Sequence, residues 1–382
     1  EHIEREQNLT SQSEEETELE HMEWLEKALK RLEKDMPSWF SIREKELSRS
    51  DSDDMRIETT SLLDEIDAIL NESIEDTHST PYSSLRKLVK QLFLVKVESS
   101  EDDDNEKETS CERLGALIAT CDEYKDSPAL VLVFDKILDE PRVRSFLLDP
   151  GVISGELFGI CRGSILMSGT LFPPKMYADL LRIPNDRPLI IKEYSSPFLS
   201  ERRPVLIAQN TTSRYTERGF QNTENIRNHI AEVIRNTPGH VALFAQSYAM
   251  LKQILEDDNW IPWGVRTEEE RARMSKRDIG EMIQRLYQRR RTKDRVLICG
   301  VLSGKLAEGV DYPENILDAV ICVGLPVPPP SARQDALREY CVDKFGRDLA
   351  GRYSSHQPAV NSLLQAIGRP IRKAEDRALV VI

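Results

Sequence analysis

The sequence predicts an α/β fold, in which a parallel sheet flanked by helices follows a mainly helical region. Two patterns predict it. In the second half of the chain, short apolar runs typical of buried strands alternate with segments of helical periodicity, as in βαβ units. In the first part, apolar residues recur every three or four positions, the spacing of amphipathic helices. The 382 residues are enough for two or three domains.

The first predicted helix lies in the acidic N-terminal part of the chain. Residues 1–18 are polar, and we expect them to be poorly ordered in isolation. An apolar stripe then runs from Met22 to Met36, with charged residues between its members. Because proline lacks an N–H group and disrupts a helix interior, we expect this helix to end at Pro37.

Two more helices are expected at 57–70 and 85–95, followed by a solvated acidic loop at 98–108 and a buried strand at 130–134. Each helical stripe needs an apolar partner. The stripes are short, which favours a helical subdomain whose helices bury one another over a protein-binding coiled coil.

The second half alternates strands and helices. Its expected strands lie at 164–168, 205–208, 241–245, 295–300, 319–323 and 378–382. Its expected helices lie at 224–234 and 248–255. We interpret Arg289, Arg290 and Arg291 as part of a solvated basic turn, and the buried-looking His240 as structural.

Charge is unevenly distributed along the chain, whose net charge is -14. Residues 201–382 hold 28 Lys and Arg against 23 Asp and Glu, whereas residues 1–200 hold 24 against 43. Only the second half is therefore suited to contact phosphates over much of its surface. No apolar run is long enough to span a membrane, and no two cysteines have the Cys-x-x-Cys spacing of zinc sites, so we expect no metal ligands.

A Gln-x-x-Gly-Arg-x-x-Arg stretch precedes the last apolar run. On a helix, Gln365, Arg369 and Arg372 would share one face, because they lie at i, i+4 and i+7. Arginine offers a planar fork of donors that matches phosphate oxygens. A solvated basic helix explains the stretch about equally well. Pro370 requires either that the helix begins near Gly368 or that the shared face is strained.

A second stretch places glycines and carboxylates after a predicted strand, from Gly304 to Asp311. Glycine lets backbone amides approach a ligand, and a carboxylate such as Asp311 can accept hydrogen bonds from ribose hydroxyls. Small hydroxyl residues, Ser168 and Thr170, follow another predicted strand, although they also suit a turn or a helix cap.

Taken in their order along the chain, four stretches resemble motifs III, IV, V and VI of the XPD/DinG branch of superfamily 2 iron–sulfur DNA helicases. Met167–Leu171 resembles motif III, Gly239–Tyr248 motif IV, Gly304–Tyr312 motif V and Gln365–Arg372 motif VI. The resemblance covers about 146–382. It implies an arch-like region at 1–145, the end of motor domain 1 at 146–186, and a RecA-like motor domain 2 at 187–382.

The resemblance also implies roles for individual residues. It places Gln365, Arg369 and Arg372 at the γ-phosphate of ATP as catalytic residues, and Glu308, Gly309 and Asp311 in the nucleotide site. It places the following residues on nucleic acid: Ser168, Thr170, Arg214, Tyr215, Ser247, Tyr248 and Lys305. Pairs such as Arg214 and Tyr215 can bind phosphate and stack on a base.

The function implied by the resemblance is ATP-dependent 5′–3′ unwinding of DNA, in repair, by a monomer that binds single-stranded DNA and duplex junctions in the nucleoid or the nucleus. The sequence contains no Gly-x-x-x-x-Gly-Lys-[Ser/Thr] loop and no Asp-Glu-x-His. We therefore expect the C-terminal part of a helicase, inactive alone, with the phosphate loop, the Mg²⁺ carboxylate and the 4Fe–4S cluster in the missing N-terminal part of the same protein, which holds most of motor domain 1. A DinG-like or RNA-directed helicase and a non-catalytic nucleic-acid-binding module remain alternatives.

Overall fold

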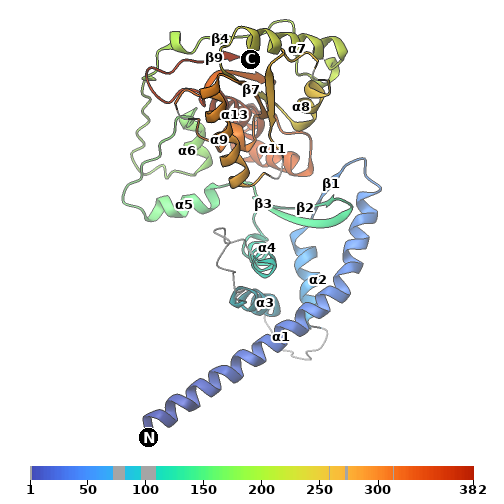
Figure 1. The fold of residues 1–382 in the computed structure, drawn as a ribbon. Coiled ribbons are helices and arrows are strands. Elements are labelled where there is room, and N and C mark those ends of the chain that lie inside the picture. Colours follow the sequence, from blue (N-terminus) through green and yellow to red (C-terminus); the bar gives the residue numbers. More distant parts are fainter. Residues whose placement is uncertain (1, 72–81, 96–108, 258, 272–273, 313) are drawn as a thin grey trace. The chain divides into compact units, whose positions relative to one another are not determined.

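Figure 1 shows the computed structural model, which describes residues 2–71, 82–95, 109–257, 259–271, 274–312 and 314–382, with side chains from residue 20 onward. These residues form two compact units. The first comprises Glu1–Ile153 and Pro330–Lys344, and the second comprises Ser154–Pro329 and Phe345–Ile382. Within the described ranges, no helix is both long and apolar enough to cross a membrane.

Helix α1 (His2–Leu47) is longer at both ends than predicted. Residues 2–18, which we expected to be poorly ordered in isolation, belong to this helix, because propagating a helix costs less than nucleating one. The predicted end at Pro37 was wrong. Trp39, beyond the proline, is buried in the core of this unit, and that packing outweighs the hydrogen bond that proline removes.

Three further helices of the first unit share a core with α1. Helices α2 (Thr59–Asn71) and α3 (Ser83–Leu94) confirm the predicted ones, and α4 (Ser110–Tyr124) was not predicted. Their apolar faces meet those of α1 in a single core cluster. The acidic run predicted to be a loop at 98–108 lies outside the described residues.

The first unit also contains an antiparallel sheet that the sequence did not reveal. Its strands are β1 (Asp54–Ile57), β2 (Leu130–Ile137) and β3 (Glu140–Leu147), in the order β1-β2-β3. Only β2 was predicted, since its apolar run is continuous. Strand β3 was not predicted, because its charged residues Arg142 and Arg144 interrupt the apolar pattern of a strand. Both arginines pair with the buried Asp135 of β2.

Helix α11 (Ala332–Phe345) joins the first unit although it is distant from it in sequence. Asp54 accepts a hydrogen bond from the amide of Ala332 at 2.9 Å, and Arg56 forms an ion pair with Glu339 at 2.5 Å. Lys344 donates to the buried Asp149 at 2.6 Å.

The second unit is built on a six-stranded sheet, which confirms the predicted α/β class (Figure 1). All its pairings are parallel, in the order β4-β9-β8-β5-β7-β6. The strands are β4 (Val205–Leu206), β5 (His240–Ala245), β6 (Val265–Glu269), β7 (Arg295–Val301), β8 (Leu317–Val323) and β9 (Leu379–Val381). Strand β6 was missed, because it is short and ends in charged residues.

Helices cover both faces of this sheet. Two apolar clusters show the division: α7 (Phe220–Arg235) and α8 (Tyr248–Leu255) pack on one face, and α9 (Lys276–Thr292), α10 (Lys305–Glu308) and α13 (Gln357–Ile367) pack on the other. The strands alternate their side chains between these clusters, as a two-sided sheet requires.

Two smaller predictions in this unit were wrong. Residues 164–168 form no strand, and Ile165 and Met167 are 87% and 88% exposed, because no described strand lies beside them to complete a ladder. The basic turn is instead the end of α9. Arg289 pairs with Glu268 at 2.9 Å and Arg290 pairs with Asp318 at 2.6 Å, so neither side chain is simply solvated.

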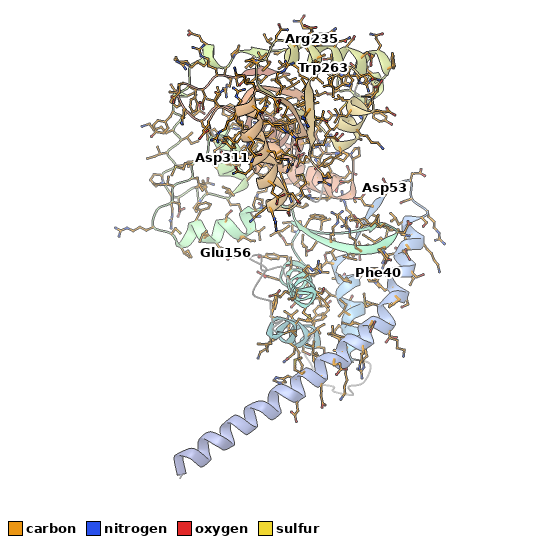
Figure 2. All side chains as sticks on the ribbon, in the orientation of Figure 1. Phe40, Asp53, Glu156, Arg235, Trp263 and Asp311 are labelled. Carbon is orange, nitrogen blue, oxygen red and sulfur yellow. The ribbon has the colours of Figure 1, made fainter. Side chains whose placement is uncertain are left out.

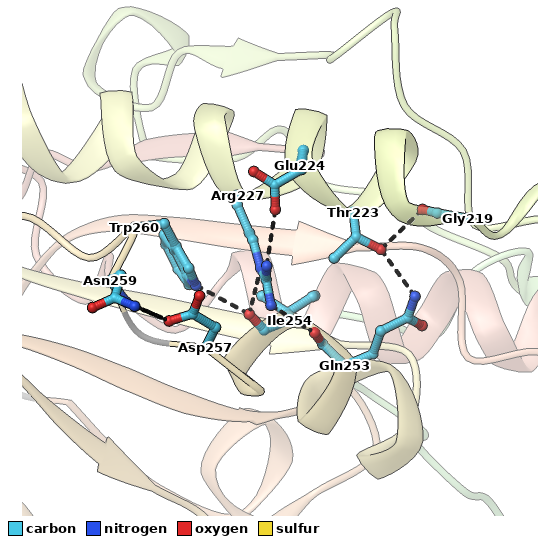
Figure 3. A network of polar contacts seen from close by, with 9 residues as sticks. All are labelled: Gly219, Thr223, Glu224, Arg227, Gln253, Ile254, Asp257, Asn259 and Trp260. Carbon is cyan, nitrogen blue, oxygen red and sulfur yellow. Dashed lines mark hydrogen bonds and ion pairs between the residues drawn. The ribbon is translucent and has the colours of Figure 1, made fainter.

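Figure 3 shows how α7 and α8 are held together by polar contacts. The guanidinium of Arg227, on α7, donates to the carbonyls of Gln253 and Ile254 at 3.1 and 3.0 Å. The indole N–H of Trp260 also donates to the Ile254 carbonyl. These donors satisfy carbonyls at the end of α8 that have no partner within the helix.

His240 is fully buried and structural, as predicted. Its Nδ1 accepts a hydrogen bond from the amide of Val296 at 3.2 Å, and its Nε2 donates to the carbonyl of Leu286 at 2.9 Å, so the ring is neutral. Burial lowers the pKa of His240, and the nearby Arg290 acts in the same direction.

We expect this histidine to make the chain less stable in mild acid. A group whose pKa is lower in the folded state contributes stability above its unfolded pKa of about 6.5, and that stability is lost as the pH falls below it. The free energy of unfolding should therefore decrease by up to about 1.4 kcal/mol for each pH unit between the two pKa values. Urea unfolding at pH 7 and pH 5 tests this, with substitution of the half-buried His229 by Gln as the control. An equal response to pH in His240→Gln and the parent chain would contradict it.

Candidate nucleotide and nucleic-acid site

The helix of the Gln-x-x-Gly-Arg-x-x-Arg stretch ends before its arginines. Helix α13 ends at Ile367, and Gly368 caps it by donating from its amide to the carbonyl of Leu364 at 3.1 Å. Pro370 disfavours helical geometry at Arg369, which explains the end. The predicted single helical face for Gln365, Arg369 and Arg372 was therefore wrong, since only Gln365 lies on the helix.

Arg369 binds the backbone of the preceding glycine-containing stretch. Its Nε donates to the carbonyl of Ala307 at 2.5 Å, its Nη1 to the carbonyl of Val310 at 3.0 Å, and its Nη2 to the carbonyl of Glu308. Burial lowers the pKa of Arg369, and Arg372 acts in the same direction. The guanidinium therefore holds the segment 307–310 in place.

Arg372 pairs with Asp311, the carboxylate predicted for the nucleotide site. Its Nη2 lies 2.6 Å from the Asp311 carboxylate, and the two side chains are 38% and 78% exposed. Asp311 is labelled in Figure 2. The loop around Arg372 is held by the buried Asp376, which accepts the amides of Arg372 and Lys373 at 2.8 and 2.7 Å. The structure thus brings an accessible arginine and an accessible carboxylate together.

Gly309 makes the tight turn that places Asp311 beside Arg372. It follows α10, its amide donates to the carbonyl of Lys305 at 2.7 Å, and a Cβ here would lie 3.0 Å from that oxygen. Glu308 contributes its carbonyl to Arg369, and its side chain is half-buried.

Gln365 contacts the hydroxyl residues of the earlier stretch. Its Nε2 donates to Thr170 at 3.4 Å, and the hydroxyls of Ser168 and Thr170 lie 3.2 Å apart. Ser168 and Thr170 were predicted to bind nucleic acid and Gln365 to act on nucleotide, so the structure joins residues with different predicted roles.

Gln365 is the last of a series of polar side chains spaced four residues apart. Tyr353 donates to Asp179 at 3.0 Å, Gln357 to the carbonyl of Phe172 at 3.1 Å, and Asn361 to the hydroxyl of Tyr177 at 2.7 Å. The series crosses a π-helical turn, Arg352–His356, between α12 (Arg347–Gly351) and α13. It fastens the segment 170–179 along the helix that leads to the arginines.

Three of the nucleic-acid candidates, Ser247, Tyr248 and Lys305, lie beyond the carboxyl ends of parallel strands, where α/β sheets bind ligands. Ser247 and Tyr248 follow β5, and the Ser247 hydroxyl caps α8 by accepting the amide of Met250 at 3.2 Å. Lys305 begins α10 after β7, and its ammonium donates to the carbonyl of Met274.

Arg214 and Tyr215 lie in an exposed segment that follows β4. The Tyr215 ring is 82% exposed, and the cation over it belongs to Arg218, 5.3 Å from the ring centroid. Arg214 lies 3.4 Å from Glu217. Both side chains are accessible to a ligand, and their predicted contacts with a phosphate and a base stay a prediction.

Sequence reasoning missed Glu270, a carboxylate that is only 5% exposed. It follows β6 and accepts a hydrogen bond from the amide of Lys305 at 2.6 Å. Its sequence context, Glu268-Glu269-Glu270, resembles a solvated acidic run and carries no signal of burial.

Comparison with known proteins identifies this arrangement. Residues 230–382 match the helicase C-terminal domain family, and this range contains motifs IV to VI and five of the six strands of the sheet. Residues 230–382 are therefore a helicase C-terminal domain, and the chain is similar to XPD-type superfamily 2 helicases.

Relatives extend the likeness beyond that domain. The chain is 23% identical over 310 residues to the ATP-dependent DNA helicase CHL1 of Meyerozyma guilliermondii, which covers 75% of this chain and 37% of that protein. It is 26% identical over 227 residues to the ATP-dependent DNA helicase XPD of Sulfolobus acidocaldarius, covering 56% and 38%. A solved XPD helicase structure, 20% identical, has the same fold with a TM-score of 0.51 over 86% of this chain and 61% of that one. The chain thus spans well under half the length of these two relatives.

The residues of the site fit the sugar and phosphate part of a nucleotide. Arg372 offers a guanidinium fork for phosphate oxygens, and Asp311 offers an acceptor for ribose hydroxyls. Gly309 has no side chain, so a ligand can approach the backbone closely. In the described part of the chain, no group of three or more His, Cys, Asp or Glu is arranged to hold a metal ion.

Proposed function

We propose that this chain supplies an arch-like region, the end of motor domain 1 and the second motor domain of an ATP-dependent 5′–3′ DNA helicase that acts in repair. It works with the rest of motor domain 1 of the same protein, which carries the phosphate-binding loop, the Mg²⁺ carboxylate and a 4Fe–4S cluster. The relatives named as ATP-dependent DNA helicases support the activity. We place the protein on single-stranded DNA and duplex junctions, as a monomer, in the nucleus of a eukaryote or the nucleoid of a prokaryote.

The observation that carries this proposal is the convergence of motif V and motif VI. Arg369 binds the backbone at 307–310, and Arg372 pairs with Asp311. In phosphoryl transfer, an arginine directed at the γ-phosphate stabilises negative charge in the transition state. We assign that catalytic role to Arg372, assign the sugar to Asp311, and give Gln365 the contact that links motif VI to motif III.

The purified chain should bind single-stranded DNA but hydrolyse no ATP. Binding relies on residues beyond β4, β5 and β7, whereas hydrolysis also needs a phosphate loop and a metal carboxylate, for which this sequence has no motif. Fluorescence anisotropy with a labelled DNA oligonucleotide tests the binding, and a phosphate-release assay tests the absence of hydrolysis. Strand-stimulated hydrolysis by the chain alone would refute the division of labour. Tighter binding to single-stranded RNA than to DNA would instead favour the RNA-directed alternative.

A further inference from the structure

Glu270 occupies an unusual position for a carboxylate. It lies directly after β6, at the carboxyl end of the parallel sheet, and its amide donates to the carbonyl of Cys299 at 2.7 Å, which continues the pairing with β7. Only 5% of the residue is exposed. Burying a charged carboxylate is costly unless hydrogen bonds satisfy it, so its contacts identify what it does.

The carboxylate binds the turn between β7 and α10. One oxygen accepts the amide of Lys305 at 2.6 Å, and the other accepts the amide of Val301 at 3.4 Å. Among the contacts described for Glu270, none is with the side chain of Lys or Arg, and the Lys305 ammonium donates to the carbonyl of Met274 instead. The backbone of the turn is therefore the group that stabilises this charge.

The glycines of the turn make room for this carboxylate. A Cβ on Gly304 would lie 2.4 and 2.6 Å from its two oxygens, and a Cβ on Gly300 would lie 2.7 Å from one of them. Real Cβ atoms do not approach so closely, so Gly300 and Gly304 are needed for the carboxylate to enter. The same site lies near motif IV, because Glu270 adds to the effect of burial in raising the pKa of Tyr248.

We infer that Glu270 is a positioning residue for nucleic acid: it fixes the 301–305 turn and so sets Lys305 toward a backbone phosphate. This inference rests on the proposed binding of a single strand by Lys305. To bind a phosphate, the Lys305 ammonium exchanges the Met274 carbonyl for a phosphate oxygen. Because the carboxylate already orders the turn, this exchange moves a side chain and not the backbone, which lowers the ordering cost of binding.

The test compares variants of the full chain in binding a labelled oligo-dT strand at several salt concentrations. We expect Glu270→Ala to weaken binding about tenfold and to reduce the salt slope by about one, which is the signature of one lost phosphate contact. Lys305→Ala should do the same. Combining the two substitutions should cost no more than Lys305→Ala alone, because Glu270 acts through Lys305. Glu269→Ala, at the exposed neighbouring position, is the matched control and should leave the affinity and the slope unchanged.

Two results would overturn the inference. The first is an unchanged salt slope in Glu270→Ala, and the second is a double variant whose loss equals the product of the two single losses. A substitution that only weakened folding would lower the fraction of active protein without changing the slope per bound strand.

Amide hydrogen exchange separates this inference from the proposed function. In Glu270→Gln, which keeps the size of the side chain but replaces one acceptor by a donor, the amides of Val301 and Lys305 should exchange at least about tenfold faster. If the parent chain did not bind single-stranded DNA, the proposed function would fail. The amide hydrogen exchange of Val301 and Lys305 would still decide whether Glu270 holds the turn. Unchanged exchange at both amides would refute the positioning role.

Discussion

Replacing Arg372 by alanine in the protein with both motor domains should lower strand-stimulated ATP hydrolysis by about 10³–10⁵-fold. The reason is that its guanidinium is accessible and paired only with the exposed Asp311 among its described side-chain contacts, so it can turn to a phosphate. The affinity for single-stranded DNA should change little, because we assign Arg372 to the nucleotide. An arginine that binds a DNA phosphate would instead weaken binding and lower its salt slope. Phosphate release at saturating single-stranded DNA measures hydrolysis, and fluorescence anisotropy measures the affinity for single-stranded DNA.

Arg377 provides the matched control for this substitution. It is an exposed arginine close in sequence, and its described contacts are made by its backbone, with Asn315. Arg377→Ala should leave hydrolysis close to that of the parent protein. Arg372→Lys should recover little, because an ammonium cannot reproduce the planar fork. If Arg372→Ala retained hydrolysis and lost strand binding, the residue would belong to the nucleic-acid site.

Replacing Arg369 by alanine should damage both stability and hydrolysis. The substitution leaves the carbonyls of Ala307, Glu308 and Val310 without their charged donor. Hydrogen bonds to charged groups contribute about 1.5–3 kcal/mol each, and their effects overlap, so we expect the free energy of unfolding to fall by about 2–4 kcal/mol. Urea unfolding of the chain measures this loss.

The contrast between Arg369 and Arg372 is itself a test of the geometry. In the protein with both motor domains, each substitution should reduce hydrolysis, but only Arg369→Ala should shift the unfolding midpoint strongly. A normal midpoint in Arg369→Ala would mean that its contacts with the 307–310 backbone contribute nothing to the fold. A strongly lowered midpoint in Arg372→Ala would show that its pair with Asp311 is structural.

The apolar strands and the amphipathic helices were predictable because their signals are local. Strands β5, β7 and β8 each contain an unbroken apolar run, at 241–245, 296–301 and 319–323, because both faces of the sheet are covered. Such runs can be recognised without knowledge of their partners. The order of the motifs was likewise sufficient to recognise the helicase resemblance, because it depends only on residue types and their spacing.

What the sequence by itself determined was therefore the α/β class, the motor-domain resemblance and the identity of the candidate residues. Only the tertiary structure decided how those residues are used. Whether Arg369 meets phosphate or backbone depends on carbonyls about sixty residues away in sequence. The burial of Glu270 depends on glycines from the neighbouring strand and turn. Hydrogen-bond partners and desolvation are set by groups that are distant along the chain, and a local pattern of residue types contains no information about which of them meet.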